Sequence, residues 1–320
     1  MLLNHIAKKK SIWIVLIIAL LIIIPFIANT YWLRMITFIL MYAALAEGWN
    51  IMGGFTGYIS FGHAAFFGIG AYTAGILSVE FGTPLFVAII MAGLVSLILS
   101  FLLGLPILKL KGHYFALVTF GIAEAIKGVI NNLTITGGGK GLSLPIIFNY
   151  YLYYYLFLGL MLLAVITAFL VRNSRLGYGL IAIRENEEGA AAMGINTTKF
   201  KVIAFAISTI IFGLAGAIYA NWITFIETPD VFSLHLSVAV ILITLLGGSG
   251  TVYGPIVGAL FYQGLSELLW NHLLILHRAS LGLIMIIVIM FIPKGFMEVV
   301  SGRRKFSWNV LRENLRCYSE

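Results

Sequence analysis

Apolar stretches of the sequence contain four ionisable side chains, Glu47, Glu124, Lys127 and Glu267. Burial in lipid is costly for a charged group, so each of them is expected to face protein or water. Glu124 and Lys127 are three positions apart on one predicted helix, where they can form an ion pair. Glu47 and Glu267 have no such neighbour, and an isolated carboxylate at membrane depth is a candidate for proton coupling in a carrier.

The sequence contains no residue pattern that is typical of an enzyme active site. The histidines are scattered, and neither a His-x-x-x-His metal pair nor a Gly-x-Ser-x-Gly nucleophile turn is present. The glycine-rich run at 137–141 is not a phosphate loop, because Lys140 is followed by Gly141 instead of Ser or Thr. We therefore expect no catalytic residue, no metal ligand and no bound cofactor on this chain.

The composition excludes a soluble globular protein. Of 320 residues, 61% are hydrophobic and 10% are charged, against about half and about a quarter in soluble domains. A helix needs about 20 apolar residues to cross a bilayer, so the chain has room for about ten spans. The net charge of +8 is typical of cationic cytoplasmic loops, so the expected partner is the lipid bilayer and not a nucleic acid.

The pattern of apolar runs predicts an all-α polytopic bundle with both termini in the cytoplasm. A cytoplasmic N-terminus places 16 of the 20 Lys and Arg residues inside, as the positive-inside rule requires. The parts are a cytoplasmic segment 1–10, a transmembrane domain 11–293 and a basic cytoplasmic tail 294–320 that carries Cys317. The predicted spans lie near 11–28, 33–52, 61–81, 85–108, 113–130, 151–171, 202–222, 233–247, 254–270 and 279–293.

Two connections between the predicted spans are longer than a turn. The segment 131–150 is external, nearly neutral and glycine-rich, which predicts a flexible loop. The segment 172–201 is cytoplasmic and is the largest charged block between spans. Its Ala- and Glu-rich centre, followed by Gly194 and Asn196, predicts a short helix that stops at a glycine.

Glycine is concentrated at 53–72 and again at 247–259. Such density has two explanations: a broken helix that borders a wet pathway, or small residues that let neighbouring helices approach closely. Both remain open from the sequence. The two Gly-Gly pairs fall at corresponding places of the two halves, which is the pattern of a transporter built from two structural repeats with interrupted helices.

The chain resembles the LivM-type permease of branched-chain amino acid ABC importers in four ordered motifs. They are GGFTGYISFGHAAFFGIGAY at 53–72, KLKGHYFALVTFGIAE at 109–124, ENEEGAAAMGIN at 185–196 and GGSGTVYGPIVGALF at 247–261. The resemblance covers roughly 33–293.

This resemblance implies a permease subunit of an ATP-driven importer, located in a bacterial or archaeal cytoplasmic membrane. Its substrate would be leucine, isoleucine, valine or a similar compound, delivered by an external amino-acid-binding protein. The implied partners are a second permease of the LivH type and two cytoplasmic ATPase subunits of the LivG and LivF types. ATP would bind to those subunits and not to this chain.

The cytoplasmic block is similar to the ABC permease motif in which a short helix docks on the ATPase. Glu188, Ala190 and Gly194 fit that motif, whereas Gly189 replaces its first alanine and the later Ile-x-Leu-Pro element is absent. The expected docking residues are therefore Arg184, Glu185, Glu187, Glu188, Ala190 and Gly194. The alternative is a solvated helix that only obeys the positive-inside trend.

Small and polar side chains suited to a zwitterion in transit are expected to line part of the path. They are Asn50, Gly57, Ser60, Gly62, His63, Thr119 and Ser249. Two other classes of function remain open. The chain could act alone as a proton-coupled or passive carrier that uses Glu47 or Glu267, or it could be a structural subunit whose glycines pack against a partner and touch no substrate.

Overall fold

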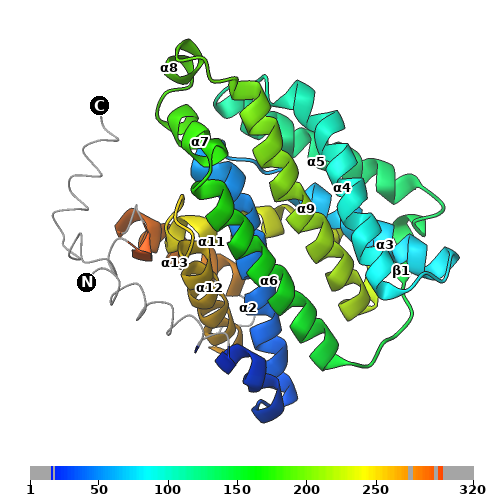
Figure 1. Cartoon of the computed structure of the whole chain (residues 1–320). Coiled ribbons are helices and arrows are strands. Elements are labelled where there is room, and N and C mark those ends of the chain that lie inside the picture. The colour runs from blue at the N-terminus through cyan, green and yellow to red at the C-terminus, as the bar shows by residue number, and fades with distance from the viewer. Residues whose placement is uncertain (1–15, 17–18, 273–276, 292–294, 298–320) are drawn as a thin grey trace.

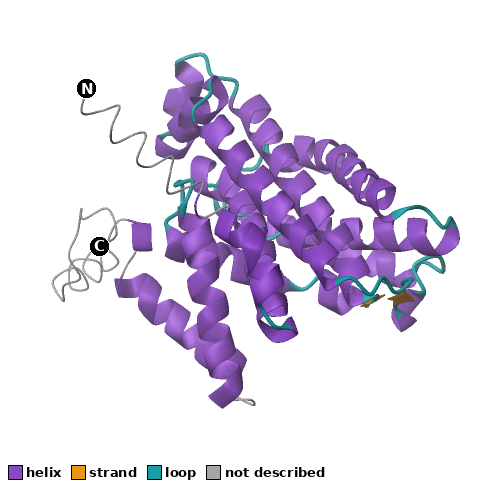
Figure 2. Ribbon diagram, turned by 60° about the horizontal axis from the view of Figure 1, so that its bottom comes forward, coloured by secondary structure: helices purple, strands orange, loops and turns teal. Residues whose placement is uncertain are grey.

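The computed structural model describes residues 16, 19–272, 277–291 and 295–297, and most of them lie in helices (Figure 1, Figure 2). The longer helices are α2 (Thr30–Trp49), α3 (His63–Glu80), α4 (Leu85–Ile107), α5 (His113–Asn132), α6 (Tyr150–Arg172), α9 (Thr197–Ile223), α11 (Leu234–Gly247), α12 (Gly254–His272) and α13 (His277–Phe291). The short elements are the π-helix η1 (Asn50–Gly54), the 3-10 helix η2 (Gly138–Lys140), α7 (Arg175–Glu185), α8 (Glu187–Ala192), α10 (Thr228–Val231) and the strands β1 (Leu142–Ser143) and β2 (Phe225–Ile226).

Six helical stretches in the described part of the chain are long and apolar enough to cross a membrane. They are Thr30–Gly54, Leu85–Ile107, His113–Asn132, Tyr150–Arg172, Thr197–Ile223 and Thr228–Gly247. Three further helices, α3, α12 and α13, stand where spans were predicted. The all-helical, polytopic class is thus confirmed, whereas the count of ten spans, the two repeats and the side of the termini stay predictions.

The ends of the chain are described only in part. Residues 19–27 of the predicted first span are helical, while 11–15 and 17–18 lie outside the described residues. The segment 1–10 and the tail beyond 297, including Cys317, also lie outside them.

Polar side chains explain where several helices begin. The Oδ1 atoms of Asn29, Asn149 and Asn196 each accept a hydrogen bond of 3.0 Å from the backbone N–H three residues later. Asn186 does the same at the start of α8, at 2.9 Å, and Ser174 caps α7. These residue types are preferred at this position because they satisfy a backbone donor that the first helical turn leaves unpaired.

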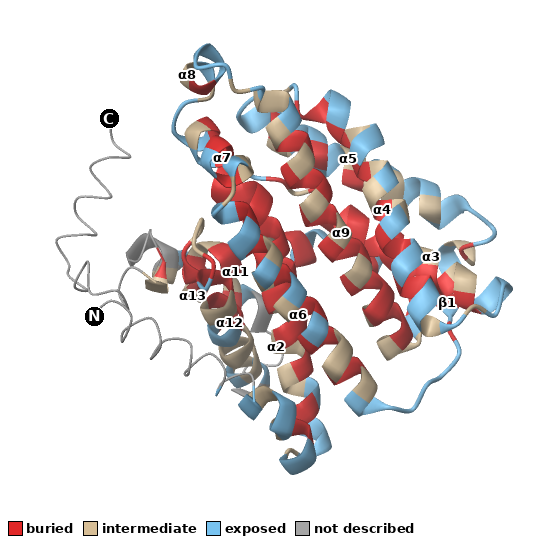
Figure 3. Cartoon of the chain, viewed as in Figure 1, coloured by how far each residue is buried: buried red, intermediate tan, exposed pale blue. Residues whose placement is uncertain are grey.

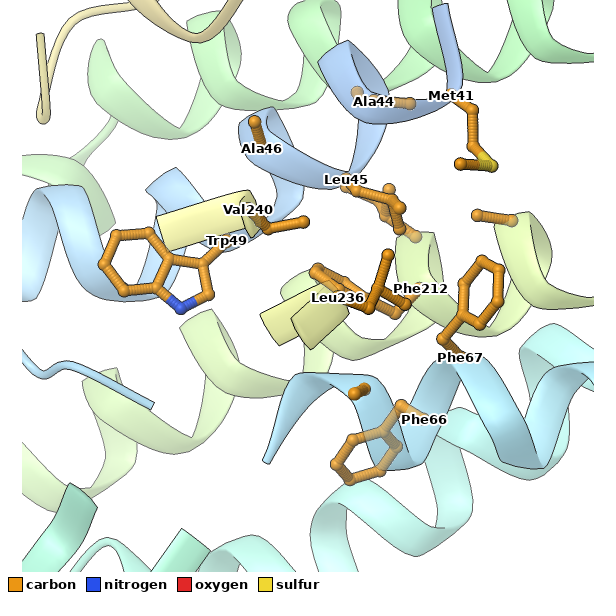
Figure 4. Packing of buried hydrophobic residues seen from close by; sticks show 14 of the residues in the cluster. Met41, Ala44, Leu45, Ala46, Trp49, Phe66, Phe67, Phe212, Leu236 and Val240 are labelled. Atoms are coloured by element: carbon orange, nitrogen blue, oxygen red, sulfur yellow. The ribbon is translucent and has the colours of Figure 1, made fainter. Parts of the chain in front are cut away.

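The core of the bundle is centred on α9, which packs against α2, α3 and α4 (Figure 3). Buried apolar side chains from α2, α3, α9 and α11 meet there, among them Leu45, Phe67, Phe212 and Val240 (Figure 4). The helices α3 and α9 approach each other closely, and a Cβ added at Gly216 would lie 1.9 Å from the Phe67 carbonyl oxygen. Close packing is therefore one of the roles of the glycines, as in other membrane bundles.

The glycine-rich connection 131–150 is not a simple flexible loop, which corrects the prediction. It contains η2 and the strand β1, and β1 pairs antiparallel with β2, with Leu142 opposite Ile226. Leu142 and Leu144 are also buried against the bundle. The prediction failed because the pairing joins β1 to a segment more than 80 residues later along the chain, and a local reading of glycine content cannot detect such a partner.

We predict that Gly216→Ala destabilises the protein, because its methyl group would press on the α3 backbone. Overpacking of this kind costs about 1–3 kcal/mol, so the melting temperature of the detergent-purified protein should fall. The matched control is Gly159→Ala in α6, where a Cβ would meet nothing within 4 Å. Equal melting temperatures for the two variants would contradict the close packing of Gly216 against the backbone of α3.

Candidate functional site

The two glycine clusters meet in space, and the side chain of Asn50 joins them. Asn50 is completely buried in η1. Its Nδ2 donates to the Thr251 carbonyl oxygen at 2.8 Å, and its Oδ1 accepts from the Gly250 N–H at 2.8 Å. We call this contact between residues 50–54 and 248–251 the glycine junction. The two bonds satisfy the backbone N–H of Gly250 and the backbone C=O of Thr251 in the segment that follows α11.

Glycine is required at two positions of the junction. A Cβ at Gly54 would lie 1.9 Å from Asn50 Oδ1 and 2.7 Å from the Gly250 nitrogen. Gly250 has a φ of +77°, a conformation that other residues rarely adopt. Close packing therefore accounts for glycine at these positions, and the helix continues from α2 through η1 to Thr56 without a break. Whether the glycines also border a wet pathway stays a prediction.

Arg184 attaches the segment after α6 to this junction. Its Nη1 donates to the Gly54 carbonyl oxygen at 2.8 Å. Space for the guanidinium exists only because position 250 is a glycine, since a Cβ there would lie 2.7 Å from Nη1. Arg184 lies in the last turn of α7, and α8 begins two residues after α7 ends, so we call residues 175–192 the α7–α8 arm.

A second attachment links the arm to α9. The buried ammonium of Lys201 lies 2.7 Å from Glu187 Oε1 and donates to the Tyr58 hydroxyl at 3.3 Å. Tyr58 in turn donates to Glu187 Oε2, and Lys201 Nζ lies 4.4 Å from the centre of the Tyr58 ring. The side chain of Lys201 is only 1% exposed, so its charge depends on this carboxylate.

Two opposing effects act on the pKa of Glu187. Burial is the larger single effect and raises it, but the hydrogen bonds from Lys201 and Tyr58, together with the Lys201 charge, outweigh burial and lower the pKa below its usual range. The carboxylate is therefore ionised at neutral pH, as the ion pair requires.

The other predicted docking residues differ in their exposure. Glu188 pairs with Lys111 at 3.1 Å, but both side chains are largely exposed, so this pair contributes little to stability. Glu185 is exposed and Ala190 is buried. Gly194 follows α8 with a φ of +88°, which confirms the predicted glycine stop. Whether these residues touch an ATPase stays a prediction.

The polar residues predicted to line the path lie mostly inside the bundle. His63 Nε2 lies 2.7 Å from Ser208 Oγ, and Thr119 Oγ1 accepts from the Phe61 N–H at 3.2 Å. Asn50, Ser60, Gly62, His63 and Thr119 are buried, whereas Gly57 is exposed and Ser249 is half-buried. Most of them are thus buried inside the bundle, and their role in transport stays a prediction.

The four predicted intramembrane charges have different surroundings. Glu124 and Lys127 form the expected ion pair at 3.2 Å. Glu47 is fully buried, and neither of its carboxyl oxygens has a hydrogen-bond partner. Glu267 is not isolated, because the Tyr31 hydroxyl donates to its Oε1 from a position 236 residues earlier, which corrects the sequence interpretation.

Sequence reasoning missed three residues of this site: Tyr58, Lys111 and Lys201. Lys201 could have been found from the sequence. A lysine at the start of an apolar span is buried only where an acidic side chain balances its charge. For Tyr58 and Lys111 the sequence offers no signal, since their partners are 129 and 77 residues away.

The polar groups of the site bind one another and hold the arm to the bundle at two places. The described residues include no group of three His, Cys, Asp or Glu side chains placed to hold a metal ion. With six helical stretches that are long and apolar enough to cross a membrane, the described part of the chain is that of a polytopic membrane protein.

The family follows from comparison with known proteins. Residues 31–292 match the family described as "Branched-chain amino acid transport system / permease component", and the chain belongs to this family. It is 29% identical to the LivM high-affinity branched-chain amino acid transport system permease proteins of Salmonella typhimurium and Escherichia coli, over 93% of this chain and 77% of each relative. It is also 29% identical to the autoinducer 2 import system permease protein LsrC of Yersinia pseudotuberculosis, over 63% of this chain and 59% of that protein. No solved structure matches the chain significantly.

We predict that Glu187→Gln loosens the α7–α8 arm, because it leaves the buried Lys201 ammonium without its counter-charge. Hydrogen bonds to charged groups contribute about 1.5–3 kcal/mol, so amides of residues 175–192 should exchange hydrogen roughly tenfold faster or more. The control is Glu185→Gln, which alters an exposed carboxylate two positions away. Unchanged protection of the arm in Glu187→Gln would contradict the attachment.

The same attachment should depend on pH in a defined direction. Because the folded pKa of Glu187 is lowered, its contribution is complete above the unfolded value of about 4.3 and is lost as the pH falls through the folded value. Hydrogen exchange of the arm should therefore accelerate, beyond its intrinsic pH dependence, only at acidic pH. In Glu187→Gln that additional acceleration should be absent.

Proposed function

We propose that this chain is a membrane-spanning permease subunit of an ATP-driven importer that translocates branched-chain or similar amino acids. Membership of the family and the names of the LivM relatives support the substrate class. The observation that carries the ATP-driven part is the double attachment of the α7–α8 arm, through Arg184 to the glycine junction and through Glu187 to α9. An arm that is attached at two places can transmit a displacement caused by a partner protein to the bundle.

The proposed partners are those of a multi-subunit importer. A LivH-type permease completes the membrane part, two cytoplasmic ATPases of the LivG and LivF types bind ATP, and an external protein delivers the amino acid. This chain itself binds no cofactor in the proposal. The complex resides in a bacterial or archaeal cytoplasmic membrane.

The proposed orientation places the α7–α8 arm in the cytoplasm. Basic residues gather at its end of the bundle, including Lys109, Lys111, Arg172 and Arg175, as expected for cytoplasmic loops. The strands β1 and β2 and the start of α2 then face outward. Both termini are cytoplasmic in this arrangement.

The proposed mechanism begins when the partner ATPases close and displace α8. Glu187 passes the displacement to Lys201 at the first turn of α9, and Arg184 passes it to Gly54 in η1. Movement of α9 and η1 shifts the junction and the buried polar groups around His63, which border the inner part of the path. In this way one displacement of α8 acts on the path through both α9 and η1.

A self-contained proton-coupled carrier is the second candidate, and Glu47 is the observation that favours it. A fully buried carboxyl without a hydrogen-bond partner is costly to ionise, and a group of this kind can take up and release a proton during transport. If this function holds, vesicles containing only this chain should accumulate substrate along an imposed proton gradient, and Glu47→Gln should abolish the uptake.

The first test is recovery of the native complex. We expect purification of the tagged chain in mild detergent to retain a second permease and two ATPase subunits, with ATP hydrolysis stimulated by the loaded binding protein. Recovery of the chain alone, with full transport activity in vesicles, would overturn the proposal in favour of the carrier.

A second prediction concerns the end of α8. Gly194→Val should lower both uptake and transport-linked ATP hydrolysis several-fold, because strain at its positive φ misplaces the docking segment. The affinity of the binding protein for its ligand should not change. The matched control is Gly82→Val, which imposes similar strain at a φ of +60° in open space beyond the far end of α3. Equal uptake and equal ATP hydrolysis in the two variants would show that Gly194 does not belong to the docking segment.

A further inference from the structure

Three cavities lie along α2 between Tyr31 and Tyr42. The start of α2 lies at the end of the bundle away from the α7–α8 arm (Figure 1). The volumes of the three cavities are about 650, 210 and 120 Å³. Phe38 lines all three and Tyr42 lines the two smaller ones, so they form one continuous recess between α2 and α12 that reaches the start of α11. We call this recess the outer groove.

Charges of opposite sign line the outer groove without pairing with each other. Arg34 and Glu267 border the largest cavity, and Asp230 borders the smallest. The ion pairs found among the described residues involve none of these three side chains. The hydrogen bond from Tyr31 engages only Oε1 of Glu267, so Oε2 can accept from a ligand.

The smallest cavity is lined by Tyr219 as well as by Asp230. Charged side chains near a membrane bundle are stable only where they face water or protein. A wet recess with a cation and carboxylates on its walls therefore matches a ligand that carries both charges.

Apolar side chains line part of the remaining wall, beside the polar Gln263 and Ser266. Met35, Phe38 and Trp270 line the largest cavity beside Arg34 and Glu267. Its volume falls within the range of about 300–1,000 Å³ that is usual for small-molecule sites. The combination of one cation, carboxylates and aromatic surface suits a small zwitterion with an apolar side chain.

We propose that the outer groove is the site where the permease first receives a free amino acid with an apolar side chain, with Arg34 facing its carboxylate and Glu267 its ammonium group. The inference rests on the proposed function, because it takes the start of α2 to be external. It assigns the groove to a substrate that the delivering protein has already released.

Two features distinguish this ligand from the alternatives. A proton site needs a carboxyl group but no cation, whereas Arg34 and Glu267 border one cavity. A zwitterionic lipid headgroup shares both charges with an amino acid, but its acyl chains would extend into the surrounding membrane, whereas Met35, Phe38 and Trp270 place apolar surface within the recess itself. Occupation of the groove by a lipid headgroup is therefore one of the outcomes that the experiment distinguishes.

The test uses the assembled importer in nanodiscs of phosphatidylcholine and phosphatidylglycerol, without its binding protein. A reporter thiol is introduced by Gln263→Cys, because Gln263 lines the two larger cavities. Cys317→Ser removes the only native cysteine. The rate of labelling by a charged methanethiosulfonate reagent is measured with and without leucine, and the control reporter is Ser143→Cys in the exposed part of β1.

Leucine should slow labelling of the Gln263→Cys reporter about tenfold at ten times its dissociation constant and should leave the Ser143→Cys reporter unchanged. Arg34→Gln and Glu267→Gln should each weaken protection by leucine about tenfold or more. The control substitution Glu80→Gln, which alters an exposed side chain, should not weaken protection by leucine. Protection should also be weak with 3-methylbutylamine, which lacks the carboxylate, and with 4-methylpentanoate, which lacks the ammonium group.

The inference is overturned if leucine fails to protect the groove in a complex that still hydrolyses ATP and imports substrate. It is also overturned if phosphatidylethanolamine in the nanodisc, but not leucine, slows the labelling, because the groove then holds lipid. Loss of the partner subunits or of coupled ATP hydrolysis in the same sample would instead contradict the proposed function, so the two failures can be told apart.

Discussion

The buried carboxamide of Asn50 is the interaction on which the arrangement of the bundle depends. A helix that stops inside an apolar protein leaves backbone donors and acceptors unpaired, and each unpaired group costs several kcal/mol in such surroundings. Asn50 supplies one donor and one acceptor from a single side chain, to Thr251 and Gly250. The segment after α11 can therefore lie against η1, which is 200 residues earlier in the chain. Arg184 is seated on the same junction through Gly54.

The helices themselves were predictable because the information for them is local. Apolar runs of 20 or so residues, ended by Asn, Gly or charged side chains, determine where spans begin and stop. The caps at Asn149 and Asn196 lie where the runs start. The β1–β2 pairing was not predictable, because two strands of two residues each carry no periodicity of their own.

The site was predictable only to the extent that its contacts are local. Glu124 and Lys127 lie three positions apart, and their ion pair follows from helix geometry alone. The partner of Glu267 is Tyr31, and that of Glu187 includes Tyr58. Both contacts join segments separated by more than 100 residues. They require the packing of whole helices to be known first.

The Asn50 contact carries no net charge, and this has an electrical consequence. An elementary charge that crosses the full membrane potential exchanges about 2.3 kcal/mol with it for every 100 mV. A joint made of a neutral amide and backbone groups exchanges almost none. The Asn50 contact itself is therefore insensitive to the membrane potential, and the charged group at the junction that can respond to it is the guanidinium of Arg184.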